Sequence, residues 1–298
     1  MNKYDSPQVG ALARLEALAQ ALEGQGQYNV AKLFRAAGAS IVSDTAWKLN
    51  VGTEKEELER EVRNLIADLD EAGMQAELLE AMASGADAIS DGRLPLIDET
   101  PHPYVCRTCG HIAMTPPSDS CPRCNARPRT FQRFPPVYWL EAMDPPEALE
   151  WLQRTPEQVL GLIDPLEEAD LSRELIEGEW SIRELLIHLR DAQGVLEYRV
   201  NLLLSEDEPL IESQAVFDWA TDGSAKQMTS MDIFETYRSS RQKTIERLQN
   251  APLADWWRGG SHQEFGTVNV KQQVSYFATH ELTHLPQLES LIERLPKG

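Results

Sequence analysis

Two histidines four positions apart, His280 and His284 in the segment ATHELTHLPQL, are the residues best suited to chemistry in this sequence. On a helix, side chains at this spacing lie on one face, one turn apart, so two imidazoles can share a metal ion. Neighbouring apolar residues at spacings of three and four predict that this face points toward a core. Because a metal ion satisfies two buried neutral imidazoles at once, the pair predicts a metal site.

The same letters form an H-E-x-x-H pattern, in which zinc proteases use the glutamate as general base. Those enzymes take a third ligand from downstream, but only fourteen residues follow His284 and none is a histidine. Glu281 is a candidate base only if a bend at Pro286 turns it inward, since at position i+1 it is expected to point away from the His280 face. We therefore do not expect a protease, and a third ligand has to come from upstream.

The third ligand is expected on an upstream helix. Ser181 and Glu184 predict a capping box that opens the apolar-patterned segment SIRELLIHLRDAQGVLEYRVNLLL. His188 lies at the edge of the apolar face of this segment. A single histidine there is usually a core residue, but the unfinished pair makes His188 the expected third ligand.

A second candidate metal site is formed by four cysteines in two pairs. Each pair is a C-x-x-C knuckle, and eleven residues separate the pairs, a spacing suited to a tetrahedral four-sulfur site. Gly110 and Asn125 follow the knuckles and tolerate the positive φ that turns backbone amides toward sulfur. Such a cage accepts either zinc or iron. The predicted ligands are Cys106, Cys109, Cys121 and Cys124.

The segment from Tyr104 to Phe134 resembles the rubredoxin-like domain of rubrerythrins, in its paired knuckles, its Cys-Pro at the second knuckle and its closing phenylalanines. In that family the cysteines hold iron and pass electrons to a di-iron centre in a helical bundle. A di-iron bundle needs Glu-x-x-His pairs, and no histidine precedes His102 here. The resemblance therefore implies a four-cysteine site of zinc or iron, without peroxide reduction.

Helical patterning dominates the rest of the chain. Four helices are expected before residue 90, and four more after a Pro-rich link, the first of these beginning at Thr155-Pro156. The segment from Ala251 to Val268, with Trp256, Trp257 and His262, is expected to be a loop. We predict a mainly α protein with a helical module at 1–98, a four-cysteine knuckle domain at 99–135 and a four-helix bundle at 136–298.

The C-terminal half contains a series of short motifs spread over most of its length. They are Gly178-Glu179-Trp180-Ser181-Ile182, His188-Leu189-Arg190-Asp191, Glu208-Pro209-Leu210, Asp218-Trp219-Ala220, Gly266-Thr267-Val268 and His280-x3-His284-Leu285-Pro286-Gln287-Leu288. In these motifs the chain resembles the DinB-like (DinB/YfiT-type) family of metal-binding four-helix bundles. In that family three histidines, one from the second helix and two from the fourth, bind a divalent metal. The resemblance implies His188, His280 and His284 as ligands of zinc, nickel or iron, and Gln193 departs from a glutamate that the family often has.

The resemblance also implies a range of activities. Three histidines leave an open metal position for water or substrate, and relatives include thiol-dependent S-transferases and a thiol-dependent isomerase. We expect a metal-dependent transferase or hydrolase acting on a small molecule, with a low-molecular-weight thiol as a candidate co-substrate. Two alternatives stay open, an electron-transfer or redox-sensing protein and a metal-stabilised scaffold without catalysis. Dimers are common in the family, so a homodimer is an expectation.

The charge and hydropathy of the chain limit which partners and which cellular location we expect. A formal net charge of −20 argues against nucleic acid or an anionic membrane surface, because both would repel the chain. No run of eighteen apolar residues occurs, and the first ten residues lack the pattern of a secretion signal. We therefore expect a cytoplasmic protein, in which four cysteines indicate a metal site before disulfides.

Overall fold

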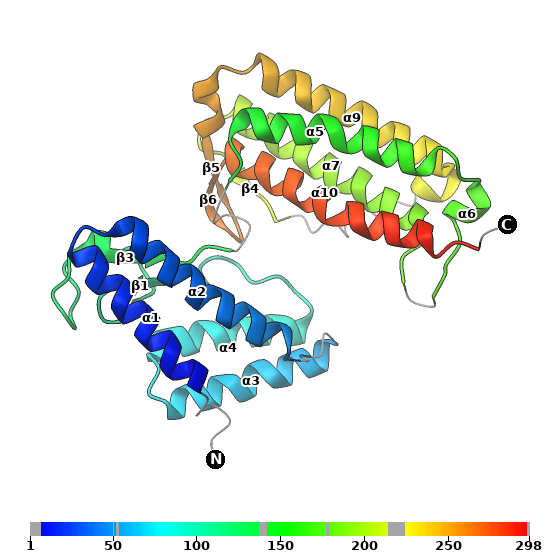
Figure 1. Cartoon of the computed structure of the whole chain (residues 1–298). Helices are drawn as coiled ribbons and strands as arrows, with labels where there is room; N and C mark the ends of the chain where they lie inside the picture. The colour runs from blue at the N-terminus through cyan, green and yellow to red at the C-terminus, as the bar shows by residue number, and fades with distance from the viewer. Residues whose placement is uncertain are drawn as a thin grey trace. The chain divides into compact units, whose positions relative to one another are not determined.

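The computed structural model describes residues 7–49, 51, 54–136, 142–176, 179–213 and 224–296, and they are mainly helical (Figure 1). Gly178 and Asp218-Trp219-Ala220 lie outside these ranges. The chain divides into two compact units, Met1–Pro95 with Glu99–Arg133, and Leu96–Asp98 with Phe134–Gly298. The predicted helical module and knuckle segment fall in the first unit, and the divisions predicted after residues 98 and 135 stay predictions.

The first unit contains two helical hairpins. Each helix packs along its sequence neighbour, α1 against α2 and α3 against α4. Between the members of each pair the chain turns through a glycine with positive φ, Gly26 at +75° and Gly73 at +77°, a conformation that costs glycine little. The four helices expected before residue 90 are confirmed as α1 (Pro7–Gly24), α2 (Tyr28–Trp47), α3 (Lys55–Glu71) and α4 (Ala76–Asp91).

The knuckle segment of the first unit is a small antiparallel sheet. Its strands are β1 (Tyr104–Cys106), β2 (Ile112–Ala113) and β3 (Phe131–Arg133), in the order β2-β1-β3, with a 3-10 turn at Pro128–Thr130 before β3. Within residues 104–133, all of which are described, only Cys106 and Cys121 are buried. A sheet this small therefore has almost no hydrophobic core of its own.

The second unit is built on four long helices that run side by side (Figure 1). The capping box predicted from Ser181 and Glu184 is present, and α10 begins directly after its N-cap, Asn269. Apolar faces of all four helices form two hydrophobic clusters inside the bundle. The helices are α5 (Pro145–Ile163), α7 (Ile182–Ser205), α9 (Ser230–Asn250) and α10 (Val270–Glu293), with a short α6 (Glu168–Leu171).

The first bundle helix begins earlier than predicted. The structure starts α5 at Pro145, after Asp144 at the N-cap, so the expected start at Thr155-Pro156 is wrong. Pro156 lies inside the helix, where it cannot donate to the carbonyl of Leu152. The buried Arg241 guanidinium supplies the missing donor, at 3.2 Å from the Leu152 oxygen. A contact from another helix thus makes an internal proline acceptable.

The segment between α9 and α10 is more ordered than the expected loop. It contains a 3-10 turn, η5 (Leu253–Trp257), and a hairpin of β5 (Gly259–His262) and β6 (Gly266–Asn269). Strand β4 (Leu210–Ile211), which follows α7, adds to β5 in parallel register. The Ile97 amide also donates to the Gln263 carbonyl in this unit. A second 3-10 turn, η4 (Ser224–Gln227), precedes α9.

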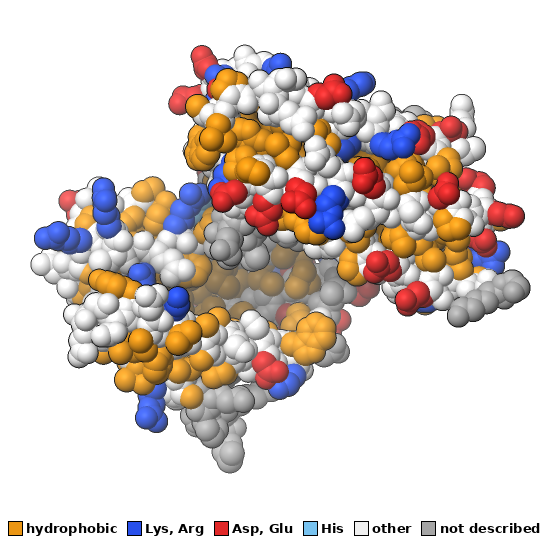
Figure 2. All heavy atoms as spheres, turned by 45° about the horizontal axis from the view of Figure 1, so that its top comes forward, with side chains coloured by type: hydrophobic (Ala, Val, Ile, Leu, Met, Phe, Trp, Pro, Cys, Tyr) orange, Lys and Arg blue, Asp and Glu red, His pale blue; other side chains and the backbone are white. Residues whose placement is uncertain are grey.

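The acidic surplus is spread over helix surfaces. On the face shown in Figure 2, acidic side chains are interspersed with basic and apolar ones. Some acidic residues pair with a basic residue one helical turn away, as Glu235 does with Arg238. Within the described residues, no helix combines the length and the apolar character needed to cross a membrane.

Candidate metal centres

The three predicted histidines come together inside the bundle. His188 projects from α7, and His280 and His284 project from α10. The Nε2 atom of His188 lies 3.1 Å from that of His280 and 3.2 Å from that of His284, and the His280 and His284 Nε2 atoms are 3.1 Å apart. Each ring therefore directs the same nitrogen at one point.

This arrangement fits a metal ion better than it fits three free imidazoles. In a tetrahedral site with bonds near 2.05 Å, two ligand nitrogens lie about 3.3 Å apart, close to the observed distances. Burial, with the charges of neighbouring histidines, lowers the pKa of His188 to about 4 and that of His280 to about 3. These two rings are therefore neutral near pH 7, and neutral imidazole is the metal-binding form.

The hydrogen bonds of the Nδ1 atoms, which point away from the shared point, show whether the His284 and His280 rings are held in orientation. His284 Nδ1 lies 2.8 Å from Gln287 Oε1, which can only accept, so Nδ1 carries the proton and Nε2 keeps its lone pair for a metal. His280 Nδ1 is buried without a hydrogen-bond partner. Gln287 is thus a positioning residue for one ligand, which the sequence analysis did not identify.

Two aromatic side chains enclose the histidines. Trp180, just before α7, lies 4.9 Å from the His188 ring and stacks on His284 at 6.3 Å between centroids. Tyr276 stacks on His280 at 6.1 Å with an interplanar angle of 20°. The Trp180 and Tyr276 rings limit how a substrate can approach the three nitrogens.

Glu281 does not take part in this cluster. It is fully buried, and both of its carboxylate oxygens accept hydrogen bonds from the Arg241 guanidinium on α9. Tyr237 donates a further bond at 3.2 Å. Burial opposes the charge on Arg241, but the Glu281 carboxylate outweighs it and raises the Arg241 pKa above its usual range. The expectation that Glu281 points away from the His280 face is consistent with this pairing.

Gln193 extends the buried network rather than the histidine group. Its side-chain oxygen accepts a bond of 2.6 Å from Arg241 Nε, and its nitrogen donates to Ser240 and Thr244 on α9. An amide can do both, because it carries an acceptor and a donor group. The network therefore ties α7 and α9 to Glu281, and to the backbone of α5 through Leu152.

The four cysteines also converge, on two knuckles of the first unit. Cys106 Sγ lies 3.7 Å from Cys124 Sγ, and Cys109 Sγ lies 3.7 Å from Cys121 Sγ. Tetrahedral bonds of 2.3 Å to one ion place sulfurs about 3.8 Å apart, so the spacing suits a single metal.

The knuckle backbones have the expected shape. Gly110 has φ +75° and Asn125 has φ +60°, which confirms the positive φ predicted at both positions. Burial disfavours the Cys106 thiolate, but the amides of Thr108 and Cys109 donate to its sulfur and lower its pKa to about 6. A thiol that ionises readily is a good metal ligand.

The helices of the first unit hold this segment. Arg107 pairs with Glu23 of α1 at 2.9 Å, and its carbonyl accepts from Gln20. The Gln75 side chain, just before α4, exchanges two hydrogen bonds with the Ile112 backbone. These contacts explain why the helical module and the knuckles form one compact unit.

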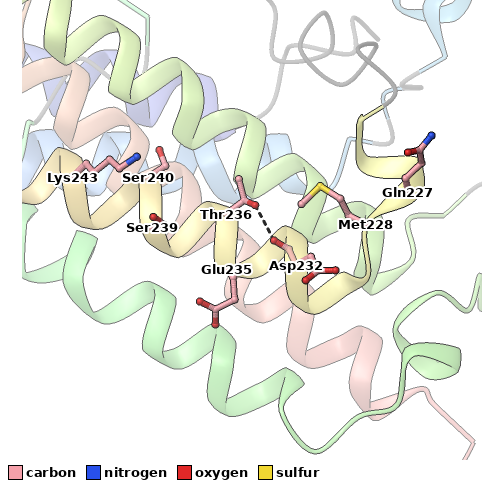
Figure 3. Close-up of a pocket in the computed structure, with 8 residues that line it drawn as sticks. All are labelled: Gln227, Met228, Asp232, Glu235, Thr236, Ser239, Ser240 and Lys243. Atoms are coloured by element: carbon pink, nitrogen blue, oxygen red, sulfur yellow. Dashed lines mark hydrogen bonds between the residues drawn. The ribbon is translucent and has the colours of Figure 1, made fainter.

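Three residues of the predicted loop, Trp256, Trp257 and His262, are not members of the histidine group. His262 is fully buried, Trp256 is 3% exposed, and Trp257 is 54% exposed. An open groove of about 640 Å³ runs along α9. Figure 3 shows side chains that line it, such as Thr236, Ser239 and Lys243. The described lining of this groove includes none of the three histidines, so we assign it no catalytic role.

Comparison with known proteins finds similarity over the residues that form the four-helix bundle. Residues 151–288 match the model of the DinB superfamily. A protein of Halalkalibacterium halodurans named "Putative metal-dependent hydrolase" is 23% identical over 141 residues, which cover 47% of this chain and 81% of the relative. A protein of the same description from Oceanobacillus iheyensis is 28% identical over 145 residues, covering 47% and 82%.

A solved structure described as "YfiT from Bacillus subtilis is a probable metal-dependent hydrolase with an unusual four-helix bundle topology" aligns with a TM-score of 0.46 at 17% identity, covering 52% of this chain and 90% of that one. The three-histidine group and the metal-dependent relatives together support a divalent metal in the bundle. Over residues 151–288, the C-terminal part of this chain is DinB-like.

Proposed function

We propose that the C-terminal bundle is a metal-dependent enzyme for a small-molecule substrate, in which His188, His280 and His284 hold one divalent ion of zinc, nickel or iron. The convergence of their three Nε2 atoms within 3.1–3.2 Å carries this proposal. The relatives named as metal-dependent hydrolases support it.

A divalent ion on three histidines supplies an open position at which a nucleophile or substrate is polarised. The chain's own residues prepare that position. Gln287 fixes the His284 ring, and Trp180 and Tyr276 cover its sides. Within the described residues, the histidine group contains no carboxylate, and Glu281 is engaged by Arg241. Among the described residues, the histidine group therefore includes no carboxylate base that could activate the nucleophile.

This arrangement suits two reactions. In one, water attacks the substrate and the enzyme is a hydrolase, as the relatives are named. In the other, a low-molecular-weight thiol displaces a leaving group and the enzyme is an S-transferase. A thiol loses its proton far more readily than water does, so a site whose described residues supply no carboxylate base favours the thiol-dependent reaction.

Metal content and cobalt spectroscopy on the full chain test the proposal. We expect His280→Ala to lose one divalent ion per chain by mass spectrometry while keeping the bundle folded. In cobalt-loaded protein, added cysteine should produce a new sulfur-to-cobalt absorption band that His280→Ala lacks, while cobalt at the four cysteines contributes equally to both. Full metal retention by His280→Ala would refute the ligand assignment.

Turnover separates the two reactions. Hydrolysis of 4-nitrophenyl acetate without thiol indicates the hydrolase. Release of chloride from 1-chloro-2,4-dinitrobenzene with cysteine, at a rate that depends on the metal, indicates the transferase. His280→Ala is the matched control in both assays.

The four-cysteine site offers a second candidate function, electron transfer or redox sensing. The two Sγ–Sγ distances of 3.7 Å favour one tetrahedral metal, which the donor set allows to be iron or zinc. Iron would give the protein thiolate-to-iron absorption in the visible range. A colourless protein with zinc at the cysteines leaves the knuckles a structural role.

A further inference from the structure

A second polar group lies deeper in the bundle, near the β5–β6 hairpin, and its hydrogen-bonding groups are incompletely paired. We define it as the donor cluster: Arg199 on α7, His262 on β5 and Gln273 on α10. Their exposed fractions are 5%, 0% and 0%. Polar groups buried to this degree normally have partners, so an unpaired set points to a missing ligand.

Arg199 carries the positive charge of the cluster. Its Nη1 donates a hydrogen bond of 3.0 Å to Gln273 Oε1. The Arg199 guanidinium forms no ion pair with any carboxylate in the described part of the chain. Burial lowers the Arg199 pKa, whereas Tyr276, Glu264 and Tyr198 oppose that shift electrostatically. Arg241 on the neighbouring helix is equally buried but is fully paired with Glu281. Among the described residues, Arg199 has no carboxylate partner of this kind.

The other two members also present donors without acceptors. His262 Nδ1 accepts from the Glu264 amide at 3.1 Å, so the neutral ring carries its proton on Nε2, and that Nε2 is buried with no partner. Burial and the charge of Arg199 lower the His262 pKa to about 3, so the ring is neutral near pH 7. The Gln273 Oε1 accepts the hydrogen bond from Arg199, and the Gln273 Nε2 is also buried without a hydrogen-bond partner.

Glu264 is the described carboxylate whose charge most influences Arg199, but it does not complete the cluster. It is half-buried, and burial raises its pKa although Arg199 opposes this shift. It makes no ion pair with Arg199 within the described residues. A water molecule could accept from some of these donors, but it would leave the buried charge of Arg199 uncompensated.

The donor cluster shares a face of α10 with the candidate metal site. Gln273 precedes His280 by seven residues, which is two helical turns or about 10 Å along the axis. Tyr276 lies between them and stacks on His280. Phe277, beside it, contacts both groups, with Arg199 5.8 Å from its ring centroid and His280 at 6.5 Å.

We propose that Arg199, His262 and Gln273 form a carboxylate-binding subsite for the substrate of the histidine centre. A carboxylate supplies the acceptors that His262 Nε2 and Gln273 Nε2 lack, and the negative charge that Arg199 lacks among the described residues. The proposal rests on the proposed function for its link to catalysis. It predicts substrates with a carboxylate about 10 Å from the group that reacts at the histidines.

Acetate, with acetamide as its neutral match, tests the subsite directly. In full-length protein with ¹⁵N-labelled histidine rings, we expect acetate to shift the His262 Nε2–H resonance saturably and acetamide to leave it unchanged. Arg199→Gln should weaken the acetate effect about tenfold or more, because it removes a buried charge-assisted contact. Arg247→Gln, which removes a solvent-exposed charge beside Ser205, should leave it unchanged.

Two further proteins keep this test separate from the metal proposal. His280→Ala should lose metal but keep the acetate response of His262, so failure of one proposal leaves the other standing. Glu264→Gln should bind acetate at least as well as the parent protein. Absence of a His262 response in the parent, an equal response to acetamide, or acetate binding seen only in Glu264→Gln would overturn the subsite. The parent titration needs no variant, so misfolding of Arg199→Gln cannot hide the answer.

Discussion

The two ligand groups of this protein depend on their surroundings in opposite ways. The four cysteines form a candidate tetrahedral set inside a segment whose buried side chains, Cys106 and Cys121, are themselves candidate ligands. The three histidines are an open set on helices that bury large hydrophobic clusters without them. A metal at the cysteines would therefore supply folding free energy, whereas a metal at the histidines would be added to a fold that already exists.

The same contrast occurs on the two sides of one helix. On one side of α10, His280 has its Nδ1 unpaired and its Nε2 aimed at a shared point. On another side, Glu281 uses both oxygens in an ion pair with Arg241. Adjacent residues of an H-E-x-x-H pattern thus have different surroundings, since the His280 ring faces the other two histidines and the Glu281 carboxylate joins helices.

The largest expected effect is on folding, and it distinguishes the four cysteines from the three histidines. Cys106→Ala should unfold residues 104–133, because a structural metal contributes about 10 kcal/mol to such small domains. His280→Ala should lose its metal and leave the bundle intact. Limited proteolysis followed by mass spectrometry checks this, with new cleavage expected inside the knuckles of Cys106→Ala only. Equal protection of the knuckles in the metal-free and metal-loaded protein would remove the contrast.

A smaller effect, on stability, distinguishes the Glu281 side of α10 from its His280 side. Glu281→Gln leaves the buried Arg241 charge without its partner, so we expect a loss of about 3–5 kcal/mol in the free energy of unfolding. Metal content at the histidines should stay the same. Chemical denaturation of the metal-loaded protein measures the change.

A surface ion pair provides the control for this substitution. Glu235→Gln removes the exposed partner of Arg238 on α9, and we expect it to cost less than about 1 kcal/mol. If Glu281→Gln instead kept full stability and abolished turnover, Glu281 would be a general base and the network would not be structural.

Local signals explain what could be predicted from the sequence. The spacing of His280 and His284, the two C-x-x-C knuckles and the capping box of Ser181 depend on neighbours within a few residues, and the structure places all of them as expected. The start of α5 was also signalled locally, by Asp144 followed by Pro145, but Pro156 resembled a stronger start.

The remaining features depend on partners distant in the sequence. Pro156 is tolerated because Arg241 reaches the Leu152 carbonyl from another helix. The strand β5 is stabilised by β4, which ends 48 residues before β5 begins, and so it read as a loop. No local signal indicates that Arg199 and Gln273 are buried, because a polar residue type indicates exposure until the packing is known.

The smallest effect tests how finely the histidine centre is positioned. Gln287→Leu removes the acceptor that fixes the His284 ring, 2.8 Å from Nδ1, and we expect metal affinity to fall about tenfold with no change in fold. Competition with a metal-binding dye measures the affinity, and Gln242→Leu, at an exposed position of α9, is the matched control. Unchanged affinity in Gln287→Leu would mean that helix packing alone orients His284. In that case the open site, like the closed one, would owe its geometry to the backbone that carries it.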